Sequence, residues 1–256
     1  FFVSKLNPID NLENIDGGYI EEQKSGGETH FKRFVEGEFS EGVEGVLFTN
    51  SMIQKAKEEN PYISNNFKVG DGLDSHLFRD QSLTHVLSLY FTIYYMKDKM
   101  RFFYNCMNWL MPGGFLIVHL VDRYKFDPIL PPGNPLYIVS PQKYAKERIT
   151  KTKVTFNDFV YNANFNLDKG ANLATFDEKF KFNDGHVRKQ QQKLYMEDTS
   201  AIVNTAQQCG FILHAKVDLV KCAYEHQYLY IFHLLSILMH PKMKFLLVLH
   251  QIKQGV

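Results

Sequence analysis

The feature that most constrains the fold is an alternation of short apolar runs with amphipathic stretches between residues 43 and 121. Residues 83–90 and 115–121 are almost continuously apolar, which is typical of strands buried on both faces of a parallel sheet. Residues 98–110 lie between them and repeat large apolar side chains at spacings of three and four, the period of a helix. Residues 111–114, Met-Pro-Gly-Gly, end that helix sharply. The alternation predicts an α/β fold with a doubly wound, mostly parallel sheet.

Two shorter units come before this pair of strands. Residues 42–48 form a predicted strand, and a helix that begins at Asn50 or Ser51 ends before Pro61. Residues 66–70 then predict another short strand. The order strand, helix, strand is therefore established before the central strands begin.

Residues 151–195 follow a different pattern, with large apolar side chains at alternate positions. The Asn-Asp-Gly sequence at residues 183–185 is a strong hairpin signal. We therefore expect an antiparallel β insertion after the central strands of the sheet. A helix that begins at Asp198 or Thr199, and two strands within residues 211–232, complete the domain.

These patterns divide the chain into three parts. Residues 1–40 are a polar, glycine-containing N-terminal segment, residues 41–232 are the α/β domain with its insertion, and residues 233–256 are a leucine-rich tail. We expect the tail to dock on the domain, and contact with a protein partner or a membrane surface is the alternative. No uninterrupted apolar run reaches about 18 residues, so no transmembrane helix is expected.

Composition narrows the possible functions. Lys plus Arg is 29 and Asp plus Glu is 28, so the formal net charge of +1 argues against a dedicated nucleic-acid-binding module. Cys106, Cys209 and Cys222 are too far apart for a Cys-x-x-Cys motif. We therefore expect no metal site, no disulfide framework and a reducing, cytoplasmic location. The basic residues within 143–153 are expected to be solvated, with a phosphate contact as the alternative.

The residues that follow each predicted strand carry the most functional information, because ligands of doubly wound sheets bind beyond the carboxyl ends of the strands. Asp71, Gly72 and Leu73 directly follow the strand at 66–70. A carboxylate beside a glycine can accept a hydrogen bond from an exocyclic amine while a following N–H reaches a ring nitrogen, which suits an adenine edge. An ordinary acidic turn is the alternative when this segment is considered alone.

Three segments in this order resemble the class I S-adenosylmethionine-dependent methyltransferases. They are Val69-Gly70-Asp71, the strand that ends at Leu89-Tyr90, and residues 109–117, Trp-Leu-Met-Pro-Gly-Gly-Phe-Leu-Ile. The sequence from Cys209 through the last two predicted strands looks like the family's final helix and antiparallel hairpin. The resemblance covers residues 17–232. It implies a Rossmann-like fold, S-adenosylmethionine as cofactor and methyl transfer as the reaction.

The resemblance also implies roles for individual residues. Asp71 corresponds to the acceptor of the adenine amine, and Leu89 and Tyr90 correspond to strand-end residues that flank the methionine moiety and the acceptor. Gly26 and Gly27 lie where the family has its glycine-rich cofactor loop. The full set of expected cofactor-binding residues is Gly26, Gly27, Asn50, Asp71, Gly72, Leu73, Leu89 and Tyr90.

Two positions depart from the family's pattern. The family has an aspartate, glycine, x, glycine motif after an apolar first strand, whereas residues 19–24 here are too charged for a central buried strand. The family also places an acid at the end of the second strand to hold the ribose hydroxyls, and Leu47 stands there. Asn50 and Glu28 are the candidates that can compensate for this lost contact.

Tyr90, Tyr94 and His119 are the candidate catalytic residues on the acceptor side. Methyl transfer needs alignment, exclusion of water and, for a protonated acceptor, a base. An aromatic face also favours a positively charged sulfonium. The alternatives are that Tyr94 packs against the following helix, that His119 is a core histidine, and that Asp122 and Arg123 form a surface pair.

The sequence thus predicts methyl transfer from S-adenosylmethionine to a small-molecule acceptor that the 151–195 insertion covers. One alternative is a methyltransferase-like subunit that has lost the cofactor and has a binding or structural role. A second alternative is an RNA or cap methyltransferase, whose affinity for RNA would fall steeply with salt.

Overall fold

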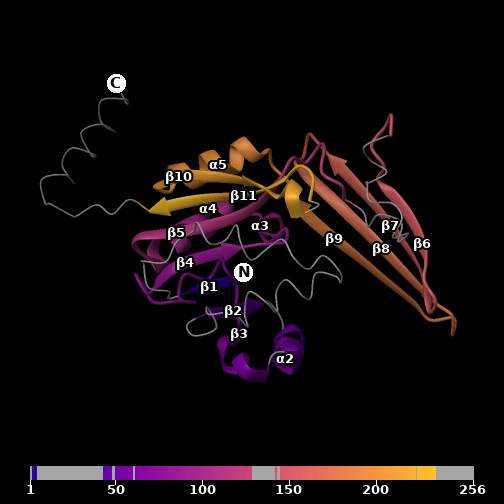
Figure 1. Cartoon of the computed structure of the whole chain (residues 1–256), viewed down its shortest axis with the longest axis horizontal. Coiled ribbons are helices and arrows are strands. Elements are labelled where there is room, and N and C mark those ends of the chain that lie inside the picture. Colours follow the sequence, from indigo (N-terminus) through magenta and orange to yellow (C-terminus); the bar gives the residue numbers. More distant parts are fainter. Residues whose placement is uncertain are drawn as a thin grey trace, which may run out of the picture.

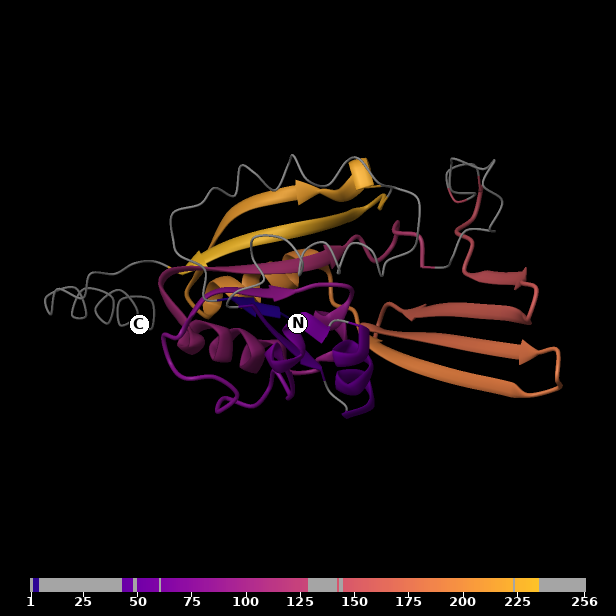
Figure 2. The same cartoon turned by 60° about the horizontal axis from the view of Figure 1, so that its bottom comes forward.

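The structure is a computed structural model that describes residues 2–4, 43–47, 50–59, 61–128, 142, 145–222 and 224–234. Two β-sheets organise these residues (Figure 1). A seven-stranded sheet carries helices packed against it, and a four-stranded sheet projects from one side of this body (Figure 2).

The seven-stranded sheet has the strand order β10-β11-β5-β4-β1-β2-β3. Its strands are β1 (Phe2–Ser4), β2 (Val43–Leu47), β3 (Phe67–Val69), β4 (Leu83–Ser88), β5 (Leu110–Val121), β10 (Phe211–Asp218) and β11 (Gln227–Leu234). β2 pairs in parallel with β3, and β4 pairs in parallel with β5. β1 is antiparallel to both β2 and β4, and β11 is antiparallel to both β5 and β10. Five of the seven strands described here therefore run in one direction, which confirms the mostly parallel α/β fold.

β5 begins at Leu110, several residues earlier than the sequence predicts. The register with β4 shifts after its first pair, so residues 111–114 bulge out of the strand. Gly113 has a φ of 82°, and a Cβ atom on Gly114 would lie 2.9 Å from the carbonyl oxygen of Thr84. Gly114 is thus required by the close approach of β4 and β5, because a side chain there would collide with backbone, and Gly113 is favoured by its positive φ.

Three of the helices described here follow the boundaries expected from the sequence, with one difference in capping, whereas the short helix after β4 and the two 3-10 helices were not expected. The helices are α2 (Asn50–Glu59), α3 (Thr92–Tyr95), α4 (Lys99–Trp109) and α5 (Thr199–Gln208), with 3-10 helices η2 (Pro61–Asn66) and η4 (Leu219–Cys222). The Asp98 carboxylate accepts a hydrogen bond from the Arg101 N–H at 2.9 Å and caps α4. Asp198 precedes α5 but makes no side-chain cap hydrogen bond, because its carboxylate is paired with Arg123 instead.

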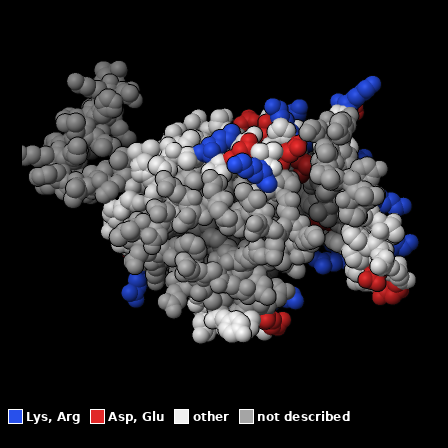
Figure 3. All heavy atoms as spheres, viewed as in Figure 1, with Lys and Arg blue, Asp and Glu red and all other residues white. Residues whose placement is uncertain are grey.

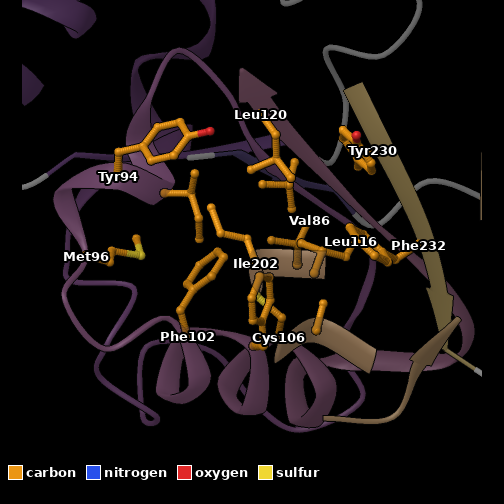
Figure 4. Packing of buried hydrophobic residues seen from close by; sticks show 14 of the residues in the cluster. Val86, Tyr94, Met96, Phe102, Cys106, Leu116, Leu120, Ile202, Tyr230 and Phe232 are labelled. Atoms are coloured by element: carbon orange, nitrogen blue, oxygen red, sulfur yellow. The ribbon is translucent and has the colours of Figure 1, made fainter. Parts of the chain in front are cut away.

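The hydrophobic core lies between the seven-stranded sheet and the helices α4 and α5 (Figure 4). Val86 and Leu116 from the sheet meet Phe102 from α4 and Ile202 from α5, and all four side chains are buried. Cys106 also belongs to this core and carries a free thiol. The spacings that predicted α4 therefore mark the face of the helix that is buried against the sheet.

The four-stranded sheet is antiparallel and consists of β6 (Lys151–Thr155), β7 (Phe159–Asp168), β8 (Leu173–Phe182) and β9 (Val187–Tyr195), in that order. β8 and β9 are joined at the expected turn, where Gly185 has a φ of 92°. This sheet is the antiparallel β insertion that the sequence predicts.

Some expectations fall on residues that the structure does not describe. His233 and Leu234 end β11, and the rest of the 233–256 tail lies outside the described residues, as do Gly26 and Gly27. Within the described part of the chain, no helix is long and apolar enough to cross a membrane, and no group of three or more His, Cys, Asp or Glu side chains is arranged to hold a metal ion.

Candidate functional site

The candidate site is the sheet edge where β2, β3, β4 and β5 end. These strands run in the same direction, so the residues that follow them are brought to one edge. Asn50 follows β2 as the exposed first residue of α2, Asp71 follows β3, and Leu89 and Tyr90 follow β4. The sequence therefore placed these residues at one edge correctly, and their contacts decide what each of them can do.

The loop after β3 folds around the Asp71 carboxylate. Asp71 Oδ1 accepts a hydrogen bond from the Leu73 N–H at 2.9 Å, and the Asp71 carbonyl accepts one from the Asp74 N–H at 2.9 Å. The N–H of Leu73, expected to face a ligand, is therefore used within the loop. Asp71 itself is exposed, and its Oδ2 makes no hydrogen bond among the described residues, so one carboxylate oxygen remains for a ligand.

Helix α4 holds this loop in place with two hydrogen-bonding side chains to which the sequence analysis gave no role at the site. The Asn105 Nδ2 donates to the carbonyl oxygen of Gly72 at 2.9 Å, and the Trp109 Nε1 donates to that of Ser75 at 3.0 Å. Asn105 is 4% exposed and Trp109 is fully buried. Asn105 could have been noticed as a polar residue on the apolar face of a predicted helix, because a buried polar side chain needs a specific partner.

The turn after β4 is conformationally strained. Tyr90 and Phe91 are consecutive residues with positive φ values of 49° and 63°, a region that large side chains rarely adopt. The Thr92 hydroxyl donates to the Leu89 carbonyl at 2.6 Å and closes the turn. The strain presents the Tyr90 ring, which is 48% exposed, at the site edge. Strained backbone of this kind concentrates at functional sites.

His119 lies on β5 beside this turn. Its ring centroid lies 6.5 Å from that of Tyr90 and 5.7 Å from that of Phe91. Burial lowers the pKa of His119 to about 4, although its hydrogen bond with Gln227 opposes the shift. Its Nε2 has no hydrogen-bond partner among the described residues. His119 is therefore a neutral imidazole at pH 7, with one ring nitrogen unpartnered beside Tyr90.

Tyr94 belongs to the core, which favours the packing alternative over a catalytic role. Its side chain is 1% exposed, and its hydroxyl accepts a hydrogen bond from the Val121 N–H at 2.9 Å. Burial also raises the pKa of the Tyr94 hydroxyl. The hydroxyl is thus committed to holding the end of β5, and Figure 4 shows the ring among the core side chains.

Tyr95 connects the site edge to the insertion. Its hydroxyl donates to the Gln192 Oε1 of β9, and the ring of Phe126, which follows β5, packs 5.6 Å from that of Phe165 on β7. The inner end of the four-stranded sheet therefore packs next to α3 and the end of β5.

Arg123 is a buried anchor and not half of a surface pair, so that expectation is wrong. It is 4% exposed, its Nε lies 2.9 Å from Asp198 Oδ1, and its Nη1 donates to Asn172 Oδ1 at 2.6 Å. The same Nη1 donates to the Met196 carbonyl. These contacts join the end of β5 to the β7–β8 turn and to the segment after β9, which no local pattern in the sequence reveals because the partners lie far apart in the chain.

The chain is similar to known proteins both in part of its sequence and in its fold. Residues 27–118 match the family described as "Methyltransferase domain". A solved S-adenosylmethionine-dependent methyltransferase from Clostridium acetobutylicum is 15% identical with a TM-score of 0.55, and the match covers 74% of each chain. CcbJ methyltransferase from Streptomyces caelestis is 14% identical with a TM-score of 0.56, over 75% of this chain and 74% of that one. The chain has the class I methyltransferase fold.

A further solved structure with this methyltransferase fold is the sugar N-methyltransferase KedS8 from a Streptoalloteichus species. It is 16% identical with a TM-score of 0.55, over 81% of this chain and 76% of that one. No curated protein matches the sequence. The domain match and the fold make S-adenosylmethionine the cofactor to test and methyl transfer the reaction to test.

The described residues fit this cofactor at two points of the edge. The exposed Asp71 carboxylate, with one oxygen that makes no hydrogen bond among the described residues, stands on a loop that α4 holds in place, and an exposed aromatic ring, Tyr90, stands on the next turn. The first can accept from an amine and the second offers a face to a cation. After the end of β2, Asn50 is exposed at the same edge.

Proposed function

We propose that this chain transfers a methyl group from S-adenosylmethionine to a small-molecule acceptor at the edge formed by β3, β4 and β5. The observation that carries the proposal is the strained Tyr90–Phe91 turn, which lies at the carboxyl edge of a class I methyltransferase fold. A turn without a ligand to position would be more stable without two consecutive left-handed residues of this size.

Each residue at the edge would contact a different part of the cofactor. Asp71 would accept from the adenine amine with the loop backbone of Gly72 and Leu73 beside it, and Asn50 would contact the ribose. Leu89 and Tyr90 would flank the reacting end. When bound, S-adenosylmethionine would supply a methyl group on a positive sulfonium, and the thioether would leave as an acceptor lone pair attacks the methyl carbon in line. Tyr90 would align that centre, and the buried, neutral His119 ring would pack beside Tyr90.

A small acceptor is favoured by the position of the insertion. The Tyr95–Gln192 and Phe126–Phe165 contacts place its inner end next to the site edge, so it can enclose a compact acceptor and exclude water. KedS8 acts on a sugar by its name, which supports the same class of acceptor here. A cytoplasmic location and a partner for the 233–256 tail remain predictions.

One specific observation favours a second candidate, a methyltransferase-like subunit that does not bind the cofactor. β1 fills the central place between β2 and β4 in the antiparallel direction, so its amino end lies at the site edge. A strand that leads into a glycine-rich cofactor loop has to run the other way. This candidate keeps the fold but predicts no affinity for the cofactor.

Calorimetry with S-adenosylhomocysteine separates the two candidates. We expect binding of about micromolar strength, and Asp71→Ala should weaken it roughly tenfold or more because a hydrogen bond to a charged group contributes about 1.5–3 kcal/mol. Asp80→Ala, at another exposed acid in the same stretch, should bind like the wild type. No detectable heat at millimolar ligand would leave only the second candidate.

The acceptor class needs its own measurement. Labelled methyl groups from S-adenosylmethionine should appear in the low-molecular-weight fraction of a cell extract and not in its RNA. Labelling confined to RNA would replace the small-molecule acceptor with the RNA alternative.

A further inference from the structure

The two faces of the four-stranded sheet differ in chemistry. Paired residues of an antiparallel sheet lie on the same face, so the register assigns every side chain to one face or the other. One face holds Phe165, Ala174 and Leu194, which are part of the hydrophobic core. The opposite face is therefore turned away from the core at the inner end of the sheet.

That opposite face carries six lysines, which we call the lysine face. They are Lys151, Lys153, Lys179, Lys181, Lys189 and Lys193, and all six are exposed. None of them takes part in an ion pair between described residues. The acids of this face are Asp168 and Asp177, and both carboxylates accept hydrogen bonds from neighbours, Asp168 from its own turn and Asp177 from Gln191. Figure 3 shows blue Lys and Arg atoms along the outer side of this sheet and red atoms at its far tip.

The arrangement of these lysines costs stability in the absence of a ligand. Lys179 stands directly opposite Lys189 in the β8–β9 pair. Like charges at directly opposite positions destabilise a sheet. An anion on this face would relieve the repulsion, which is a physical reason for lysines to gather there without acidic partners.

The lysine face is also hollowed. A depression of about 680 Å³ opens on it, and its lining includes three lysines (Lys151, Lys179 and Lys189), two asparagines (Asn162 and Asn164), Gln191 and two acids (Asp177 and Glu178). Cations interleaved with amide side chains are the donor set that contacts phosphate and sugar oxygens in nucleic-acid backbones. Neighbouring β-strands lie about 4.8 Å apart, and successive residues on the same face of one β-strand lie about 6.8 Å apart. The six ammonium groups therefore extend over several phosphates of a single nucleic-acid chain.

We propose that the lysine face binds the phosphodiester backbone of a nucleic acid without reading its sequence. The lysines neutralise phosphates, and the amides of Asn162 and Asn164 donate hydrogen bonds to phosphate or sugar oxygens. A membrane surface is disfavoured because the hollow is lined mostly by charged and amide side chains, whereas a membrane-binding face inserts large apolar side chains. The inference does not rest on methyl transfer, since this face and the site edge are different surfaces.

The test measures binding of the full chain, without cofactor, to fluorescein-labelled 20-nucleotide single strands of mixed sequence, RNA in one arm and DNA in the other. We expect affinity in both arms that falls as salt rises, because bound phosphates release counterions. Lys179→Gln/Lys189→Gln should lower the slope of log K against log salt by about 1.4 and the affinity on the order of 20-fold at about 0.1 M salt, since each single-strand contact contributes about 0.7 to the slope.

Matched variants keep the result interpretable. Lys97→Gln/Lys221→Gln removes the same charge at exposed lysines away from the lysine face and should leave the slope unchanged. Lys153→Gln/Lys181→Gln is a second variant on the lysine face and should reproduce the loss. Circular dichroism melting checks that each variant is folded.

Three outcomes would overturn the proposal. They are no binding by the wild type, equal losses in the lysine-face and control variants, and binding to vesicles of anionic phosphatidylserine without binding to either oligonucleotide. A loss confined to the lysine-face variants supports it, and a preference between the arms identifies RNA or DNA as the source of the backbone.

Discussion

Burial decides what chemically similar residues do around the candidate site. Tyr90, Tyr94 and Tyr95 lie within six positions, yet Tyr90 is exposed at the edge, Tyr94 is in the core and Tyr95 holds the insertion. A tyrosine's sequence neighbours do not reveal whether its hydroxyl meets water, backbone or another side chain. The sequence therefore identified the cluster, and only the packing assigned the separate roles.

His119 should make the protein sensitive to mild acid. Its folded pKa of about 4 lies below its unfolded value of 6.5, so its contribution is complete above pH 6.5 and is lost as pH falls from 6.5 towards 4. Between pH 7 and pH 5 the wild type should lose about 2 kcal/mol of unfolding free energy through this residue, at about 1.4 kcal/mol per pH unit. His119→Gln should reduce that loss in urea unfolding curves. Equal pH dependence in the wild type and His119→Gln would contradict the assignment.

Asn105 should stabilise the loop after β3, which carries Asp71, through one hydrogen bond. Asn105→Ala leaves the Gly72 carbonyl without its donor, which should lower the free energy of unfolding by about 1–3 kcal/mol. Because Asp71 then stands on a looser loop, S-adenosylhomocysteine should also bind more weakly in calorimetry. Asn108→Ala on the exposed side of the same helix is the matched control and should change neither quantity. Weaker binding without loss of stability would mean that Asn105 contacts the ligand itself.

At the scale of elements, alternation patterns predicted the strands and helices well, but not how they are fastened to each other. The insertion was expected from its two-residue period and its turn at 183–185, and both are confirmed. Its attachment depends on Arg123, Lys99 and their partners near residue 197. Such long-range ion pairs leave no periodic signal, because the paired residues are about 75 to 100 positions apart.

Arg123→Met should loosen the insertion as a unit. It removes the cation that joins Asp198, Asn172 and the Met196 carbonyl, which should cost about 2–4 kcal/mol of unfolding free energy. Amide hydrogen exchange should rise first in β9 and the β7–β8 turn. Lys125→Met breaks only the exposed pair with Asp122 and should cost less than about 0.5 kcal/mol. Unchanged exchange in β9 would show that ring packing alone holds the insertion.

For the whole molecule, the net charge of +1 is an average that hides a local concentration. Six lysines lie on one face of the insertion because their strands bring positions from 151 to 193 together. The sequence indicated only the basic stretch at 143–153, and Arg148 within it is half-buried and donates to two backbone carbonyls. A sum over the sequence cannot show which charges share a surface.

The sequence by itself determined the class of fold, the three longer helices among the described residues, most strands and the edge that carries the candidate site. These follow from periodicity, turn residues and strand ends, which are local properties of the chain. Only the tertiary structure decided the antiparallel central strand β1, the core position of Tyr94, the buried Arg123 anchor and the lysine face. Each of these depends on burial or on pairing between distant segments, and both are properties of the packed molecule.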